Sequence, residues 1–407
     1  MVNEEALSGD AVVRIRCLIS YLRSRGHPDG TVRCYARSVA HFERWLADER
    51  KTINERSASH FTNDHLRACA CSPPVVTHRK TVHAALNHFL VALRSAGLVT
   101  PCEPPQLSSV EVELRSYDAH LLGVCGLSSN TRIYRLRYAR EFLAHCLGGR
   151  VDRAAGLQPE QLEDFIIARA AGCCRGTAKV ICAAIRSYLK YLFLRGDVSR
   201  RIVEAVPTIP QWRLSSVPRS LDKEQVDRLL AVFDTSTSAG LRDHAMVLCM
   251  ATLGLRTSEV AGLSLGDFDW RNGIVRISTG KSRHARVLPL PEELGEAISR
   301  YLRAGRPASS EPAVFLRHTV PVGLRVTYHI VRSVVRYALA KAGINPPMPG
   351  PHLLRHTLAT QMVRNGARLT EVAGVLGHAS IDTTAIYAKV DMPLLSRVVV
   401  PWPRGAL

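Results

Sequence analysis

Residues 352–356 read His-Leu-Leu-Arg-His, residues 376–378 read Leu-Gly-His, and residues 386–387 read Ile-Tyr. From these stretches, and from one arginine and one lysine upstream, a candidate set can be drawn of two guanidiniums, an ammonium group, two of the three imidazoles and a phenol. Such a set can hold a phosphate, move protons and attack a phosphorus atom without a metal. The candidate catalytic residues are Arg256, Lys281, His352, Arg355, His378 and Tyr387.

The charge of the chain predicts a polyanionic partner. Its formal net charge is +19 at pH 7 over 407 residues, and 46 of its 54 basic residues are arginine. Arginine suits bidentate phosphate contacts better than lysine does. A field of this sign attracts nucleic acid, with binding that weakens as salt rises. We therefore expect the chain to bind nucleic acid.

Composition argues against a membrane protein. No apolar run reaches the roughly 18 residues that a membrane span requires. The acidic residues 1–5 lack the basic-then-apolar pattern of a secretory signal. The chain is therefore expected to be cytoplasmic.

The eleven cysteines are scattered along the chain. Neither Cys69-Ala70-Cys71 nor Cys173-Cys174 has the CxxC spacing of a zinc site. They are interpreted as small, reduced core residues. The sequence therefore predicts no metal site and no cofactor.

Two proline-rich stretches, residues 100–105 and 207–218, divide the chain. Prolines at this density remove backbone donors and favour extended linkers. The expected segments are residues 1–100, 106–206 and 219–407, with a linker at 207–218.

The first two segments look like copies of one helical unit, because matching residues recur at a constant offset of one hundred. Gly26 matches Gly126 and Phe42 matches Phe142. Each copy is expected to hold a helix, a glycine turn and a second helix. Further matches pair Thr31 with Thr131, for which an N-cap role is expected, Arg37 with Arg137, Thr77 with Thr177, and Ala84 with Ala184.

An expected helix around residues 131–143 combines an apolar face with several arginines. Its aromatic residues, Tyr134, Tyr138 and Phe142, recur at helical spacing and are expected to be buried. The arginines lack interleaved acids and would repel one another in free solution. This pattern favours a DNA-facing helix, with a solvated charged surface as the alternative. The DNA-binding candidates of this segment are Arg132, Arg135, Arg137, Arg140 and, off the apolar stripe of the closing helix, Lys179.

The third segment is predicted to be mainly α with a small antiparallel β-sheet, an α+β domain. Residues 220–225 start one helix, and another stops at Gly254. Two runs rich in β-branched residues, 273–278 and 285–290, flank a turn at 279–282 and predict a strand pair. The rest of the segment is predicted to be helical, with breaks at residues 305–307 and 346–351.

Arg256 follows the helix stop at the start of a new helix, where the macrodipole is already positive. The placement suits an anion bound by helix amides. Glu259, one helical turn further along the chain, can pair with Arg256 and hold its guanidinium in place. An ordinary surface ion pair is the alternative.

Lys281 lies in the expected hairpin turn, beside two further DNA-binding candidates, Arg283 and Arg286. In a chain with so few lysines it is a plausible proton donor. A solvated hairpin charge is the alternative.

His352 and Arg355 open a helix and share one face at i and i+3. The His-Glu-x-x-His zinc pattern fails, because Leu353 occupies the position of the glutamate.

An amphipathic helix at residues 369–376 is expected to end at Gly377. Ser380 can then cap a short helix, residues 381–388, that carries Tyr387. A tyrosine in such a place is usually half-buried packing, but the polar residues around this one favour a nucleophile.

With these residues assembled, residues 219–390 resemble the tyrosine recombinase family, also called phage-integrase-type or Xer-like recombinases. The resemblance implies a catalytic domain with a C-terminal tail at 219–407. It also implies a helical, SAM-like core-binding domain at 106–206, with 1–100 as a possible duplicate. The matching pieces are residues 254–259, Gly280-Lys281 before 287–290, and residues 352–356, 376–378 and 383–387.

The resemblance implies that Tyr387 attacks a backbone phosphate and forms a 3′-phosphotyrosyl link. Arg256 and Arg355 would hold the non-bridging oxygens, and His378 would donate a hydrogen bond to them. Lys281 would protonate the leaving 5′-oxygen, and His352 would take or return the tyrosine proton. Neither ATP nor a metal is implied.

The implied partner is double-stranded DNA with specific recombination sites, bound by a homotetramer or with related recombinase subunits. A nucleoid-associated enzyme of a prokaryotic mobile element is expected. The apolar tail beyond Tyr387, residues 392–403, could pack in cis or in trans. Two alternatives stay open: a type IB topoisomerase, and a sequence-specific DNA-binding regulator with a silent active site.

Overall fold

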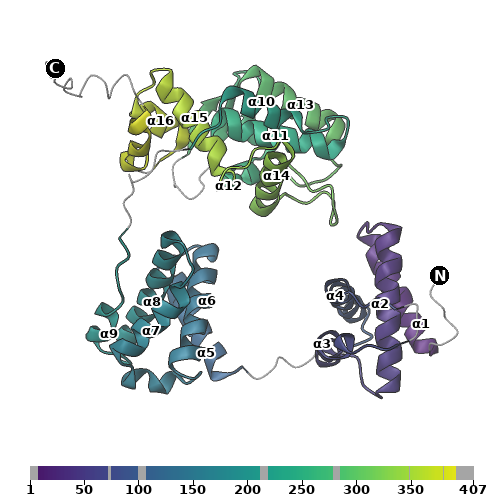
Figure 1. The fold of residues 1–407 in the computed structure, drawn as a ribbon. Helices are drawn as coiled ribbons and strands as arrows, with labels where there is room; N and C mark the ends of the chain where they lie inside the picture. The colour runs from purple at the N-terminus through teal and green to yellow at the C-terminus, as the bar shows by residue number, and fades with distance from the viewer. Residues whose placement is uncertain are drawn as a thin grey trace, which may run out of the picture. The chain divides into compact units, whose positions relative to one another are not determined.

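The computed structural model describes residues 8–71, 75–99, 107–210, 219–277, 285–347, 349–378 and 380–390 (Figure 1). The described residues contain three groups of elements, each with its own hydrophobic core. They are the N-terminal bundle (8–99), the middle bundle (107–210) and the C-terminal unit (219–390), and each is described by itself.

The N-terminal bundle is helical throughout its regular elements. Ser8 caps the first helix, because its Oγ accepts from the Ala11 N–H at 3.3 Å. Phe42, Phe61 and Phe89 are fully buried in the core. The elements of the described residues are α1 (Gly9–Ser24), α2 (Asp29–Asp48), α3 (Glu55–Asn63), the 3₁₀ helix η2 (His65–Arg67) and α4 (Arg79–Ser95).

The middle bundle has the same helical character. Ser108 caps its first helix and accepts from the Glu111 N–H at 3.2 Å. Its described elements are α5 (Ser109–Gly123), α6 (Ser129–Cys146), the 3₁₀ helix η3 (Val151–Gly156), α7 (Pro159–Ala170), α8 (Arg175–Arg195) and α9 (Arg200–Glu204).

The first two helices of each bundle match at the offset seen in the sequence, whereas α3 and α7 begin at residues 55 and 159 and α4 and α8 begin at residues 79 and 175. The helices α1 and α5 begin at residues 9 and 109, and α2 and α6 begin at residues 29 and 129. Gly26 and Gly126 both take a positive φ in the turn between the helices. The expected N-caps were wrong: the extended residues before α2 and α6 are Pro28 and Ser128, so the matched threonines lie inside the first turn.

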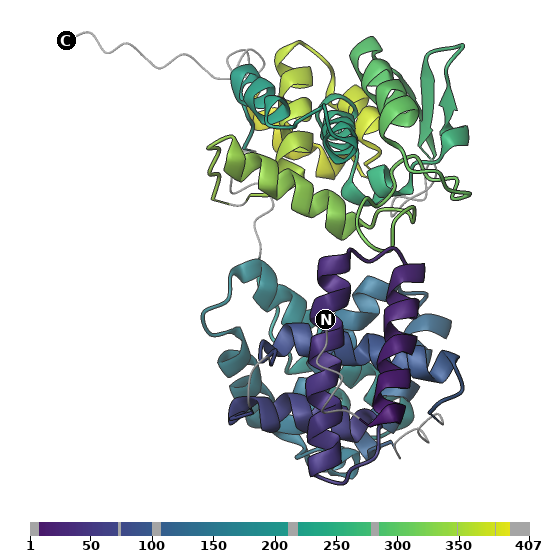
Figure 2. The same cartoon turned by 90° about the vertical axis from the view of Figure 1, so that its right-hand side faces the viewer.

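The C-terminal unit combines helices with a small sheet, and Figure 2 shows that sheet at one edge of the unit. Its helices are α10 (Lys223–Ala231), α11 (Ser238–Leu253), α12 (Thr257–Gly262), α13 (Glu292–Arg300), α14 (Tyr328–Lys341), α15 (His352–Arg364) and α16 (Leu369–Leu376). Shorter turns of helix are η4 (Leu265–Asp267), the π-helix η5 (Tyr301–Gly305), η6 (Ile381–Thr383) and η7 (Ala385–Val390).

The sheet runs in the order β1-β2-β3 and is antiparallel. Its strands are β1 (Phe268–Asp269), β2 (Ile274–Ile277) and β3 (Arg286–Pro289), so both predicted strands are confirmed. Ile274 pairs with Pro289, and Ile277 pairs with Arg286. The expected turn at 279–282 lies outside the described residues. The chain is therefore mainly helical with a small antiparallel sheet.

The prediction that the rest of this segment is helical was wrong for residues 306–327. Three prolines fall in this stretch and remove backbone donors. The structure forms isolated bridges there, between Ser264 and Ala313 and between Leu316 and Arg325.

Helix α11 forms the centre of the C-terminal unit and ends where the candidate site begins. Six consecutive residues, 245–250, are at most 1% exposed, which is typical of a helix buried on all sides. Gly254 ends it with a φ of 62°, in the left-handed region. A Cβ on Gly254 would lie 2.7 Å from Leu376 Cδ2, so only glycine lets α16 pack this closely.

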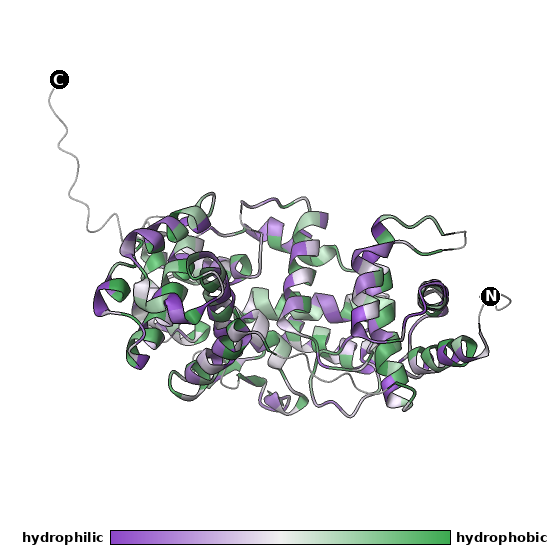
Figure 3. Ribbon diagram, turned by 90° about the horizontal axis from the view of Figure 1, so that it is seen from below, coloured by the Kyte–Doolittle hydropathy of each residue, from purple (hydrophilic) through white to green (hydrophobic). Residues whose placement is uncertain are grey.

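Hydrophobic and hydrophilic residues are interspersed along the helices of all three groups (Figure 3). Among the described residues, no helix is both long enough and apolar enough to cross a membrane.

Candidate functional site

Arg256 precedes α12 and is held by Glu259, as the sequence predicted. Its Nη1 donates to Glu259 Oε1 at 2.7 Å, and its backbone N–H donates to Oε2 at 2.9 Å. The side chain of Arg256 is 23% exposed and that of Glu259 only 2%. The pair is therefore a part of the interior rather than an ordinary surface ion pair.

Arg355 lies in the first turn of α15 and is 5% exposed. Its Nη1 donates to the Gly254 carbonyl at 2.7 Å, and its Nη2 donates to the Leu376 carbonyl. Burial first, and then the charge of Arg256, lower the pKa of Arg355 to about 10, so the guanidinium stays charged at neutral pH. Both acceptors are neutral, so they position the guanidinium without neutralising its charge.

Arg256 and Arg355 converge on the end of α16. Arg256 Nη2 donates to the Gly377 carbonyl at 3.2 Å, while Arg355 Nη2 binds the preceding carbonyl, that of Leu376. Two guanidiniums from distant parts of the sequence are thus fixed on consecutive carbonyls. Paired guanidiniums held in this way can bind a phosphate through charge-assisted hydrogen bonds.

Glu259 balances only part of the positive charge. Arg286 donates to its two oxygens at 3.2 and 2.9 Å. Burial alone would raise the pKa of Glu259, but the hydrogen bonds from Arg286 and Arg256 hold it below its usual value. Because one carboxylate faces three guanidiniums, that of Arg355 included, the site retains positive charge.

His378 follows Gly377, whose φ of 61° ends α16. Its Nδ1 lies 2.7 Å from Thr384 Oγ1. Burial first, and then the charges of Arg355 and Arg256, lower the pKa of His378 to about 4. The imidazole is therefore neutral at pH 7 in this state.

Tyr387 lies in η7 and is 1% exposed, within a cluster that includes Ala359, Val363 and Leu376. Its Oη lies 2.7 Å from His356 Nδ1. Burial raises the pKa of Tyr387 to about 12, although the charge of Arg355 acts in the opposite direction. The phenol is therefore protonated at neutral pH and is stored in the interior.

The other candidates have different positions. His352 begins α15 and is exposed, and the imidazole in contact with Tyr387 Oη is that of His356 instead. Lys281 and Arg283 lie outside the described residues. Of the six candidate catalytic residues, the structure brings together Arg256, Arg355, His378 and Tyr387.

The sequence did not indicate His356 as a site residue. This histidine entered only as the second histidine of the zinc pattern that Leu353 rules out. A helical projection places His356 on the same stripe as Ala359 and Val363, which face Tyr387. A polar residue on a buried stripe needs a hydrogen-bond partner. That signal could have indicated a tyrosine contact.

Three of the four candidate arginines of α6 pair with carboxylates and the fourth donates to a backbone carbonyl, so the premise that they lack acidic partners was wrong. Glu141 lies on α6 itself, four residues after Arg137, whereas the other acceptors lie on α5 and α8, which the sequence alone does not show as neighbours. The pairs are Arg132 with Asp118 at 2.7 Å, Arg137 with Glu141 at 3.0 Å, Arg140 with Glu111 at 2.8 Å, and Arg135 with the Ala183 carbonyl at 3.0 Å.

Side-chain exposure is informative for further residues of the middle bundle and for one residue of the C-terminal unit. Tyr134 is 54% exposed, although it was expected to be buried. Val180, an apolar residue of the closing helix α8, is 46% exposed. Lys179 is exposed beside Val180. Arg286, in contrast, has a side chain only 9% exposed and belongs to the ion-pair network of Glu259.

The comparisons with known sequences agree on one family, and one of them covers nearly the whole chain. The family model described as "Phage integrase family" matches residues 219–393. The chain is 36% identical over 406 residues to "Putative integrase/recombinase y4rA" of Sinorhizobium fredii, across 98% of this chain and 96% of that protein. It is 34% identical over 278 residues to "Tyrosine recombinase XerD" of Listeria monocytogenes, across 65% of this chain and 89% of that protein.

Two solved structures share the fold. The XerH site-specific recombinase bound to palindromic difH substrate has a TM-score of 0.55 at 20% identity, across 84% of this chain and 93% of that one. The Tn1549 transposon integrase in complex with transposon right end DNA has a TM-score of 0.54 at 17% identity, across 70% and 99%.

Proposed function

Since the chain belongs to the phage integrase family of tyrosine recombinases, a class of DNA strand-transferring enzymes, we propose that it is a site-specific recombinase. It cuts and rejoins duplex DNA through a 3′-phosphotyrosyl intermediate, with Tyr387 as the nucleophile. One observation carries this proposal: the guanidiniums of Arg256 and Arg355 are fixed on consecutive carbonyls, close to the stored phenol.

In the first step, Tyr387 Oη forms a bond to phosphorus and the bond from phosphorus to the 5′-oxygen breaks. The phenol proton passes to a histidine, and Lys281 supplies the proton that the leaving 5′-oxygen needs. Arg256, Arg355 and His378 bind the non-bridging oxygens of the pentacoordinate state. Donors placed for developing charge before the reaction need no rearrangement during it, which is their catalytic advantage.

In the second step, the 5′-hydroxyl of a partner strand attacks the phosphotyrosyl phosphorus. The tyrosine oxygen leaves and recovers a proton. The energy of the original phosphodiester is kept in the covalent link, so ATP is not needed for rejoining.

Two histidines of α15, His352 and His356, are available to accept the proton of the phenol. His352 is exposed at the start of the helix, where a DNA backbone can reach it. His356 holds the phenol in the stored state. We assign the reactive proton transfer to His352 and the storage of the nucleophile to His356.

DNA contacts are proposed for the middle bundle and for the matching N-terminal bundle. Supporting observations are the net charge of +19 and the exposed Tyr134, Arg137 and Lys179 of α6 and α8. Pairing of Arg137 and Arg140 with acids is compatible with this, because exposed ion pairs are weak and phosphates can compete for the arginines. Exchange between two duplexes requires four active sites, so a homotetramer on DNA is part of the proposal.

The biological role that we propose is integration, excision or transposition of a mobile element. Similarity to "Putative integrase/recombinase y4rA" over nearly all of both chains supports this role. A prokaryotic, nucleoid-associated location follows from the same proposal.

The test is covalent capture on DNA taken from both flanks of the gene. Full-length protein is incubated with nicked duplex fragments, which lose the 5′-hydroxyl fragment after cleavage and trap the adduct. The wild-type protein is expected to give a denaturant-resistant adduct on the 3′-phosphate side, and Tyr387→Phe is expected to give none while still binding DNA. An adduct that persists in Tyr387→Phe would overturn the nucleophile assignment.

Two further readouts separate the alternatives. A topoisomerase would relax a supercoiled plasmid that carries no paired recombination sites, whereas a recombinase exchanges strands between two sites. A silent DNA-binding regulator would bind the flank sequence and give no adduct with the wild-type protein.

A further inference from the structure

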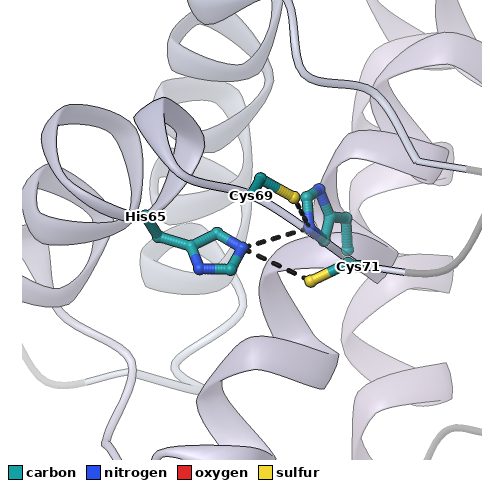
Figure 4. A group of neighbouring side chains, drawn as sticks. His65, Cys69 and Cys71 are labelled. Atoms are coloured by element: carbon teal, nitrogen blue, oxygen red, sulfur yellow. Dashed lines mark hydrogen bonds between the residues drawn. The ribbon is translucent and has the colours of Figure 1, made fainter.

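Four side chains that can ligate a metal meet in the N-terminal bundle, and none of them is among the residues proposed for catalysis. They are His41 on α2, His65 in η2, and Cys69 and Cys71 in the segment that follows (Figure 4). Their ligand atoms all lie within 4.8 Å of one another. We propose that these four residues bind a single structural zinc ion.

Three of the six separations between ligand atoms fit one tetrahedral ion. His41 Nε2 and His65 Nε2 are 3.4 Å apart, Cys69 Sγ is 3.5 Å from His41 Nε2, and Cys71 Sγ is 3.5 Å from His65 Nε2. Zinc binds nitrogen at about 2.0–2.1 Å and sulfur at about 2.3 Å. A tetrahedron with those bonds has nitrogens about 3.3–3.4 Å apart and nitrogen–sulfur edges of about 3.5–3.6 Å. The three edges therefore agree with the geometry of one bound ion.

Hydrogen bonding explains the cluster less well than a cation does. His41 Nε2 faces both His65 Nε2 and Cys69 Sγ, but a neutral imidazole nitrogen has one lone pair to offer. A cation at the centre is bound by the lone pairs of both nitrogens and of both thiolates at the same time.

The ring of His41 is fixed in the orientation that a ligand requires. Its Nδ1 lies 3.4 Å from the Val76 carbonyl, which can only accept, so Nδ1 carries the proton and Nε2 keeps its lone pair. A carbonyl behind a ligating histidine is the usual outer partner at metal sites. His41 is also 1% exposed, and the ring of Phe61 packs against it and stacks on His65.

The ligand set selects the metal. Two thiolates and two imidazoles at tetrahedral spacing suit zinc, and two thiolates neutralise its charge. A two-iron cluster with this ligand set places both histidines on one iron and both cysteines on the other. Here each cysteine lies beside a different histidine instead, so the cluster fits one ion and not two.

Because all four positions would be filled by the protein, the zinc would be structural. It would tie the connection between α3 and α4 to the buried face of α2. The sequence predicted no metal because the cysteines were judged by their own spacing, and His41 comes from a helix that precedes them by more than twenty residues.

The test measures metal content in the full chain. The protein is purified under reducing conditions, its affinity tag is removed, and it is dialysed against metal-free buffer before elemental analysis. We expect about one zinc per chain. The double variant Cys69→Ser/Cys71→Ser and the single variant His65→Asn should contain close to none. The matched control Cys173→Ser/Cys174→Ser, which removes an adjacent pair of cysteines from the middle bundle, should keep the full amount.

Cobalt gives a second, independent readout. Replacement of zinc by Co²⁺ should produce the strong visible absorption of a tetrahedral ion and a near-ultraviolet thiolate band, both lost on addition of zinc. Circular dichroism separates loss of metal from loss of fold, because Cys69 and Cys71 lie outside the helices. A wild-type chain that stays metal-free in excess zinc, or a double variant that keeps its zinc, overturns the proposal.

Discussion

Tyr387 Oη and His356 Nδ1 lie 2.7 Å apart inside a hydrophobic cluster, so the candidate nucleophile is bound by an imidazole and closed off from solvent. The tyrosine is 1% exposed, and burial raises its pKa to about 12. Attack on a phosphate therefore requires η7 to leave this position, or to shift within it, when DNA binds.

Removing either partner of this contact should destabilise the C-terminal unit. His356→Phe leaves a buried phenol oxygen without its partner, which costs about 1–3 kcal/mol. In a double-mutant cycle with Tyr387→Phe, measured by urea unfolding, the coupling energy should be about 1 kcal/mol. Simple additivity of the two variants would mean that the hydrogen bond does not contribute.

Glu259→Gln should be strongly destabilising, because it leaves the buried guanidiniums of Arg256 and Arg286 without their counter-charge. Breaking a buried ion pair from one side costs about 3–5 kcal/mol. The matched control is Glu311→Gln, whose partner Arg325 is 43% exposed, and which should change stability by about 0–1 kcal/mol. Thermal or urea unfolding of the two variants side by side checks the difference, and equal losses would contradict the buried network.

Gly377→Ala should damage the site more than it damages the fold. The residue has a φ of 61°, and an added Cβ would lie 2.6 Å from Arg286 Nη1. Gly366→Ala is the control, because Gly366 also has a positive φ but nothing lies within 4 Å of the Cβ position. Both variants carry the left-handed strain of about 1–2 kcal/mol.

Only Gly377→Ala should also displace Arg286 from Glu259. Misplacement of a positioning group by about 1 Å can lower a rate by about 100-fold. The yield of covalent DNA adduct should therefore fall far more in Gly377→Ala than in Gly366→Ala. Similar yields in the two variants would show that Arg286 has no role in ordering the site.

The pH dependence of stability should carry a contribution from His378. Its pKa is lowered to about 4 in the folded chain, so between pH 4 and the usual histidine value of about 6.5 the unfolded chain binds more protons. The stabilisation is therefore fully present above about pH 6.5 and is lost as the pH falls toward 4. His378→Gln should lose less stability than the wild type between pH 7 and about pH 5. Parallel unfolding curves for the two proteins would contradict this assignment.

The local parts of the fold were predictable from the sequence. Helix ends at Gly254 and Gly377 were predicted because glycine accepts a positive φ without strain, and both glycines adopt one. The strand pair was predicted from β-branched runs on either side of a turn. Such signals depend on residues that are neighbours in the chain.

Contacts between distant residues were not predictable in the same way. The acid that pairs with Arg140 is Glu111 on α5, and a reading of α6 alone could not find it. His41 reaches Cys69 only because α2 packs against the elements that follow α3. The candidate site was an exception, because its residues carry a family pattern as well as local signals.

Because Tyr387 is buried, binding to DNA and cleavage of a strand are separate events in the proposed mechanism. A chain with a net charge of +19 meets DNA at many places, and most of those encounters are with the wrong sequence. A phenol that is 1% exposed cannot reach a phosphodiester during such encounters. In the proposed mechanism, only an encounter that draws η7 out of this hydrophobic cluster, or shifts it within the cluster, brings the phenol to a strand, so the packing of a single side chain limits cleavage to such encounters.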